Sequence, residues 1–111
     1  MTVSLPLPQP IASYFQTVND RDSATSAALF TPNALVRDEG KTIRGTAEIQ
    51  TWRERTGAQY NPVFTPVAVL TEGPASIVAS EISGTFEGSP LTLHFHFTLD
   101  NDKIAALTIQ D

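Results

Sequence analysis

The stretch LTLHFHFTL, residues 91–99, shows the clearest periodic pattern in the chain. Apolar and polar side chains alternate at every position, which is typical of a β-strand with one buried and one solvent-facing side. We therefore expect a sheet with one face packed against a core. The side chains expected on that buried face are Leu91, Leu93, Phe95, Phe97 and Leu99.

Other segments with strand character lie on both sides of this stretch, and short turns separate most of them. They are Ala34–Arg37, Thr42–Arg44, Tyr60–Glu72, Ala75–Phe86 and Lys103–Gln110. Pro62 and Pro66 restrict the first half of one segment to a sheet edge or a bulge, because proline cannot donate to a strand ladder. Strands joined by tight turns pair antiparallel.

Three segments near the N-terminus have helical character. Residues 10–18 carry an apolar stripe at helical spacing, formed by Ile11, Tyr14, Phe15 and Val18. A short second helix runs through Phe30 with Asp22 or Ser23 as its cap, and a third runs from Gly45 to Gly57. Ile49, Trp52 and Arg53 share one face of this third helix. The pattern predicts one α+β domain over residues 1–111, with three N-terminal helices on a curved antiparallel or mixed sheet.

Composition excludes several function classes. The 111 residues carry a net charge of −5, and the seven Lys and Arg residues are scattered, which argues against binding to nucleic acid or anionic membranes. The chain has no cysteine, so disulfides and thiolate chemistry are absent. The segment Met1–Pro10 lacks the features of a signal peptide, and no stretch is long and apolar enough to span a bilayer. We expect a cytoplasmic protein.

A set of residues spread over nearly the whole chain resembles the SnoaL-like branch of the NTF2-like superfamily. They are Ile11, Tyr14, Phe15, Asn19, Asp22, Leu29, Phe30, Val36, Asp38, Glu39, Gly40, Arg44, Gly45, Ile49, Trp52, Phe95, Phe97, Lys103 and Ile104. The resemblance implies a cone-shaped fold with a pocket between the helices and the sheet. The superfamily includes ketosteroid isomerases, polyketide cyclases and limonene-epoxide hydrolases, so the resemblance implies a fold more narrowly than a reaction.

Similarity to the ketosteroid isomerases implies candidate catalytic residues. Tyr14 matches the tyrosine that donates a hydrogen bond to a developing oxyanion, and Asp38 matches the carboxylate base on the first hairpin. The third role belongs to a protonated carboxylic acid, a general example of an acid kept neutral in an apolar site. Leu93 occupies that position and cannot donate. The expected ligand-binding residues are Trp52, Phe15, Val36, Leu93 and Phe95.

Each candidate also has a purely structural interpretation. Asp38 begins an Asp-Glu-Gly turn, where a carboxylate commonly accepts hydrogen bonds from nearby backbone N–H groups. Tyr14 belongs to the apolar stripe of its helix, and Trp52 fits either a core or a pocket wall. His94 and His96 share the polar face of their strand, which favours a surface or interface pair over a metal site. We expect no metal and no cofactor, since the chain has no nucleotide-binding motif.

Three hypotheses for function follow. The first is an isomerase-type or cyclase-type enzyme that uses Asp38 as general base and Tyr14 as oxyanion donor on an apolar carbonyl or epoxide substrate. The second is a ligand-binding module without turnover, and the third is an interaction protein. In each case we expect a homodimer, because the outer face of the sheet carries few charges and some apolar side chains.

Overall fold

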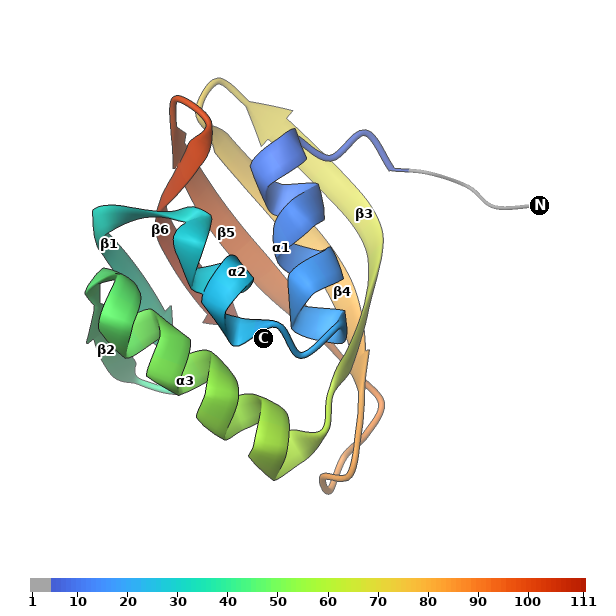
Figure 1. The fold of residues 1–111 in the computed structure, drawn as a ribbon. Helices are drawn as coiled ribbons and strands as arrows, with labels where there is room; N and C mark the ends of the chain where they lie inside the picture. The colour runs from blue at the N-terminus through green and yellow to red at the C-terminus, as the bar shows by residue number, and fades with distance from the viewer. Residues whose placement is uncertain (1–4) are drawn as a thin grey trace.

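The computed structural model describes residues 5–111, which form three helices and one six-stranded sheet (Figure 1). In chain order the elements are α1 (Gln9–Asn19), α2 (Ser23–Ala28), β1 (Phe30–Asp38), β2 (Lys41–Arg44), α3 (Gly45–Tyr60), β3 (Val63–Glu72), β4 (Ala75–Ser83), β5 (Leu91–Asp100) and β6 (Lys103–Gln110). Residues 1–4, the start of the segment examined for a signal peptide, lie outside the described residues.

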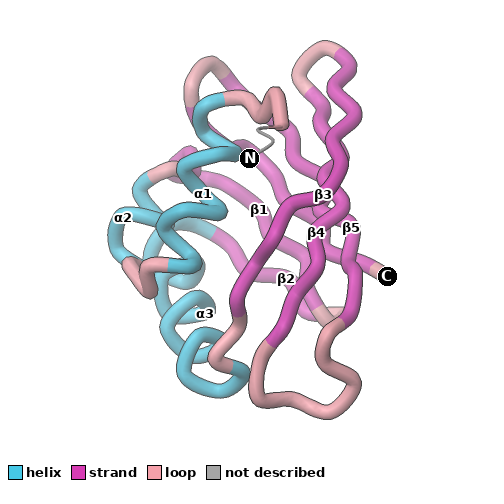
Figure 2. The backbone as a smooth tube through the Cα atoms, turned by 90° about the vertical axis from the view of Figure 1, so that its right-hand side faces the viewer, coloured by secondary structure: helices cyan, strands magenta, loops and turns pink. Residues whose placement is uncertain are grey.

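The strands are arranged in the order β2-β1-β6-β5-β4-β3. Neighbours pair antiparallel except β1 and β6, which run parallel, so the sheet is mixed. The parallel pair joins β1 and β6, the first and last strands of residues 5–111. All three helices lie on one side of the curved sheet, as the rotated view in Figure 2 shows. The predicted α+β layering is thus observed.

Residues 91–99 form a strand with one buried and one solvent-facing side, as their alternation predicts. Phe95 and Phe97 are fully buried under the helices, while His94 and Thr98 on the other face are exposed. The apolar stripe of α1 packs on these rings: Phe15 meets both Phe95 and Phe97 edge to face, with ring centres 5.3 and 5.9 Å apart. Such edge-to-face pairs favour a defined core over a loose one.

Only α1 and α2 precede the sheet, so the description of all three helices as N-terminal holds for those two alone. The third helix, α3, follows the β1–β2 hairpin, as its predicted range implied. It also continues through Gly57, which we expected to end it, and stops at Tyr60. Asn61 then adopts a left-handed conformation with φ 46°, and its backbone N–H donates to the Gly57 carbonyl. An asparagine in this role is harder to recognise than a glycine.

Other boundaries also differ from the predictions. Phe30 begins β1 rather than ending α2, and β1 includes the Thr31-Pro32-Asn33 segment because its irregular register with β6 accommodates the proline. β3 begins at Val63, and β4 ends at Ser83 rather than Phe86. The edge-or-bulge prediction for the proline-containing strand is confirmed, since β3 is an edge strand whose register shifts between Pro66 and Ala68.

The N-terminal cap of α2 is one of the two residues that the sequence predicted. Asp22 caps this helix, and its Oδ1 accepts a hydrogen bond of 3.1 Å from the Thr25 backbone N–H. Over residues 5–111, no helix combines the length and apolar character needed to cross a membrane.

Candidate functional site

A cavity of about 250 Å³ opens between the C-terminal part of α3 and the concave face of the sheet. Its wall is mainly apolar, and a few polar groups lie among the apolar side chains. The lining residues are Asp38, Glu39, Arg53, Thr56, Tyr60, Pro62, Phe64, Ile82, Phe86, Glu87, Leu91, Leu93, Phe95 and Ile109. An apolar cavity with a small number of convergent polar groups is the usual form of a small-molecule site.

The β1–β2 hairpin places Asp38 in this cavity. Asp38 is the last residue of β1 and pairs with Lys41 across a two-residue loop. Glu39 and Gly40 in that loop both have positive φ, 53° and 74°, as a tight primed turn requires. The hairpin therefore fixes the backbone of Asp38 at the end of a strand, where its half-buried side chain lines the cavity.

The side chain of Asp38 is held by Trp52 on α3. The indole Nε1–H donates to Asp38 Oδ2 at 3.1 Å. Among the described residues, no backbone N–H of the turn donates to this carboxylate, so the expected turn-acceptor bond is replaced by a contact between two elements. Burial raises the pKa of Asp38 above its ordinary value and outweighs the Trp52 hydrogen bond, which lowers it. The other carboxylate oxygen of Asp38, Oδ1, does not take part in the hydrogen bond with Trp52.

Arg53 also lines this cavity, although the sequence predicted no catalytic or ligand-binding role for it. Its side chain is 8% exposed, and its guanidinium carbon lies 4.0 Å from the centre of the Trp52 ring. Nη2 donates to Thr56 Oγ1 at 2.6 Å, and Nη1 donates to the Tyr14 hydroxyl at 3.4 Å. Within the described chain its side-chain partners are thus hydroxyl groups, and none is a carboxylate.

A signal for Arg53 was present in the sequence. It lies on the same helical face as Ile49 and Trp52, which are both buried. A charged residue on an apolar helical face is buried at a cost in free energy, so its presence there indicates a partner or a function.

Tyr14 lies behind Arg53 rather than in the cavity wall. Its side chain is completely buried among aromatic rings, including Phe30 and Phe97 at 5.9 and 5.5 Å between centres. Burial raises the pKa of Tyr14, whereas the positive charge of Arg53 opposes that rise. The hydroxyl of Tyr14 is thus connected to the cavity through the guanidinium of Arg53.

The five predicted ligand-binding residues divide into two groups. Leu93 and Phe95 on β5 line the cavity. Phe15, Val36 and Trp52 do not line it; they are buried in the core behind it. Phe15 supports the cavity wall from behind through its contact with Phe95.

Three segments that are distant in sequence meet at the mouth of the cavity. Tyr60, the last residue of α3, donates its hydroxyl to Glu39 Oε1 at 3.3 Å and packs edge to face on Phe86 with ring centres 5.9 Å apart. Phe86 belongs to the loop between β4 and β5, whose Thr85 N–H donates to the Tyr60 carbonyl at 2.9 Å. Sequence patterns gave no sign of this contact, because none of these residues is periodic with the others.

The arrangement provides a carboxylate of raised pKa and a buried guanidinium in one apolar cavity. A carboxylate of this kind can accept a proton from carbon, and a guanidinium can stabilise a neighbouring oxygen that gains negative charge. Among residues 5–111 there is no cluster of three or more His, Asp or Glu side chains that could hold a metal ion.

Comparison with known proteins supports a family assignment. A protein from Sinorhizobium meliloti described as a proposed polyketide cyclase is 32% identical, with a TM-score of 0.93 over 98% of this chain and 100% of that one. Two more distant structures share the fold. One is the epoxide hydrolase/cyclase-like enzyme of pyran ring formation in salinomycin, 22% identical, with a TM-score of 0.80 over 92% of this chain and 87% of that one.

The other is a proposed ketosteroid isomerase from Kribbella flavida, 18% identical, with a TM-score of 0.79 over 92% of this chain and 74% of that one. No curated protein matches the chain. The profile of the SnoaL-like domain matches residues 11–107, which is most of the chain. The chain therefore belongs to the SnoaL-like domain family, within the NTF2-like fold.

Proposed function

We propose that the chain is an enzyme that moves a proton on a small apolar carbonyl or epoxide substrate, with Asp38 as the general base. The observation that carries the proposal is the presence of Asp38 and Arg53 in the wall of one apolar cavity. A volume of about 250 Å³ is slightly below the usual range for drug-sized ligands, which favours a compact substrate.

The chemistry follows from these two groups. Asp38 removes a proton from the carbon next to a carbonyl, and the electron pair of that C–H bond moves to the carbonyl oxygen as an enolate forms. Arg53 stabilises the negative oxygen. Return of the proton to another carbon completes an isomerisation. Alternatively, the enolate carbon attacks a second carbonyl of the same substrate, whose C=O π bond becomes an alkoxide, and transfer of the proton from Asp38 to that alkoxide completes a cyclisation.

The family resemblance gave Tyr14 the role of stabilising the oxyanion, and in our proposal Tyr14 shares this role with Arg53. Arg53 is the donor that borders the cavity, and Tyr14 positions it through the 3.4 Å contact with Nη1. In the same way, Trp52 positions Asp38 through the hydrogen bond from its Nε1–H to Oδ2. Leu93 and Phe95 contact the apolar part of the substrate, while Phe15 and Val36 act by holding the surrounding core.

A solvent-exchange experiment tests the proposal. The protein is incubated in D₂O with a small β,γ-unsaturated cyclic ketone, and loss of the α-proton signal is followed by NMR. We expect the wild-type protein to accelerate exchange and Asp38→Asn to slow it by about 10²- to 10⁴-fold, the usual contribution of a general base. Equal exchange rates for the two proteins would contradict the role of Asp38. Saturable binding without exchange would indicate a ligand-binding module.

We also propose that the protein is a homodimer formed through the outer face of the sheet. Leu70 on β3 and Ile77 on β4 are register neighbours on this face, and they are 66% and 36% exposed. Ile77 in turn lies beside His96, which lies beside Thr108. In the part of the chain that the structure describes, no helix covers this face (Figure 2). A few-charge, partly apolar sheet face favours contact with a second copy across a twofold axis.

A further inference from the structure

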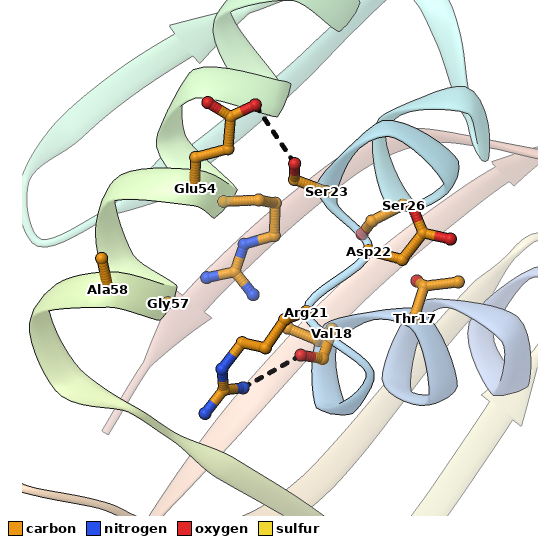
Figure 3. Close-up of a pocket in the computed structure, with 10 residues that line it drawn as sticks. Thr17, Val18, Arg21, Asp22, Ser23, Ser26, Glu54, Gly57 and Ala58 are labelled. Atoms are coloured by element: carbon orange, nitrogen blue, oxygen red, sulfur yellow. Dashed lines mark hydrogen bonds between the residues drawn. The ribbon is translucent and has the colours of Figure 1, made fainter.

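A second cleft, of about 340 Å³, lies between α3 and the α1–α2 corner (Figure 3). Thr17, Val18, Ser26 and Arg53 are buried at its floor, and exposed side chains surround its rim. The remaining lining residues are Arg21, Asp22, Ser23, Glu54, Gly57 and Ala58. Arg53 borders this cleft and the Asp38 cavity alike, so the two hollows share one cationic side chain.

Two polar atoms of residues at the floor lack a hydrogen-bond partner in the described chain. They are Ser26 Oγ and Arg53 Nε, and both atoms are buried. The other two nitrogens of Arg53 are bonded to Thr56, which lines the Asp38 cavity, and to the buried Tyr14 hydroxyl. A buried N–H group of a guanidinium without an acceptor costs free energy, and a ligand that supplies an oxygen would recover it.

The rim adds charge of both signs. Arg21 donates from Nη1 to the Val18 carbonyl at 3.1 Å and from Nη2 to Asn61 Oδ1 at 2.9 Å, so its charge has no carboxylate partner among these bonds. Glu54 Oε1 already accepts hydrogen bonds from Ser23 Oγ and Gln50 Nε2, both 3.2 Å long. Figure 3 shows the Glu54–Ser23 bond spanning the cleft from α3 to α2.

We propose that this cleft binds a small monocarboxylate, whose oxygens accept hydrogen bonds from Arg53 and Ser26. A planar carboxylate matches the geometry of a guanidinium fork. The four charged lining residues, two arginines and two acids, sum to zero, so a dianion such as sulfate is disfavoured by the acids at the rim. Val18 and Ala58 are apolar lining residues that a short apolar tail on the ligand would contact.

The test is a titration of the full chain with sodium acetate at constant ionic strength, with sodium chloride as the compensating salt. Two-dimensional NMR follows the Nε–H signal of Arg53 and the backbone amides of residues 21–26 and 53–58. We expect a saturable shift of these signals, with a dissociation constant on the order of 1 mM for so small a ligand. Sodium sulfate should produce no saturable shift at these signals.

Matched variants distinguish the cleft from general charge effects. Ser26→Ala should weaken acetate binding about 10-fold, because it removes a hydrogen bond to a charged group. Arg21→Gln should weaken it about 2- to 5-fold, and Glu54→Gln should strengthen it by a similar factor. Arg55→Gln is the control. Arg55 is exposed like Arg21, lies on α3 beside Glu54 and does not line the cleft, and its loss changes net charge as Arg21→Gln does.

The proposal is overturned if acetate shifts grow linearly without saturation, or if Arg21→Gln and Arg55→Gln weaken binding equally. Because this titration requires no substrate, its failure would leave the proposed role of Asp38 unaffected.

Discussion

At the scale of single residues, the proposed role of Asp38 as general base predicts a pH dependence of activity. Burial raises its pKa, so the charged, proton-accepting form is lost at a higher pH than for a free aspartate, whose pKa is about 3.9. We expect the acid limb of a kcat/KM profile to have an apparent pKa above that value. A direct NMR titration of the Asp38 carboxyl carbon provides an independent measurement. A value at or below about 3.9 would contradict a base held in an apolar site.

The same shift predicts an effect on stability. A carboxyl whose pKa is raised in the folded state stabilises the fold when protonated, and this contribution is lost as pH rises through the folded-state pKa. Asp38→Asn, which resembles the protonated form, should therefore be at least as stable as the wild type at pH 7. The difference should shrink towards about pH 3, where both side chains are neutral. Urea denaturation at the two pH values measures it, and a variant markedly less stable at pH 7 would contradict the assignment.

Trp52 combines packing with orientation of Asp38. Its ring is 3% exposed, so Trp52→Ala should lower the free energy of unfolding by about 3–5 kcal/mol. Trp52→Phe keeps much of the ring volume but removes the Nε1–H donor to Asp38. We expect it to raise the pKa of Asp38 further, because that hydrogen bond lowers the pKa. Chemical denaturation and carboxyl NMR measure the two effects. An unchanged pKa in Trp52→Phe would show that the indole does not control the carboxylate.

At the scale of elements, the β4–β5 loop depends on a close approach to the end of α3. A Cβ atom added at Gly84 would clash with the backbone carbonyl of Tyr60 and lie 2.9 Å from the Phe86 ring. Gly84→Ala should therefore cost about 1–3 kcal/mol of stability, as overpacking does. Gly57→Ala in the interior of α3 meets only the Arg21 side chain at 3.5 Å and should stabilise by about 0.5–1 kcal/mol. Urea denaturation should show opposite signs for the two variants.

The elements also show what the sequence could and could not predict. The β5 alternation and the α1 stripe were predictable because each repeats over several residues with one period. Phe30 was misassigned because a single apolar residue after a short helix fits either element. The parallel pairing of β1 with β6 has no local signal, since it depends on how the two ends of the chain are brought together.

The site was predictable in part for similar reasons. Asp38 was a candidate because it matches the hairpin carboxylate of the ketosteroid isomerases, and the strand period placed Leu93 and Phe95 on the buried face of the sheet. The burial of Tyr14 away from the cavity depends on how α1 sits on the sheet, which no spacing within α1 reveals. Arg53 was placed on the correct helical face, but its position between two hollows depends on the packing of α3 against α2 and the sheet.

At the scale of the whole molecule, the proposed dimer predicts a clear response to charge on the outer sheet face. At about 100 μM we expect sedimentation to give a dimer of the 12.0 kDa chain. Leu70→Glu should convert it to monomer, because the charge would be buried at the interface. Gln59→Glu adds the same charge at an exposed site on α3 and should leave the dimer intact. A wild-type monomer at this concentration would contradict the proposal.

The parallel pairing of β1 with β6 has a consequence for the order in which the protein folds. As the ribosome extends the chain, β1 emerges early, but its neighbour in the middle of the sheet is the last strand to be made. Until then the apolar side of the β1–β2 hairpin has no complete sheet to join, and pairing between distant segments slows folding. We therefore expect the sheet to close, and the domain to reach its folded state, only after β6 has left the exit tunnel.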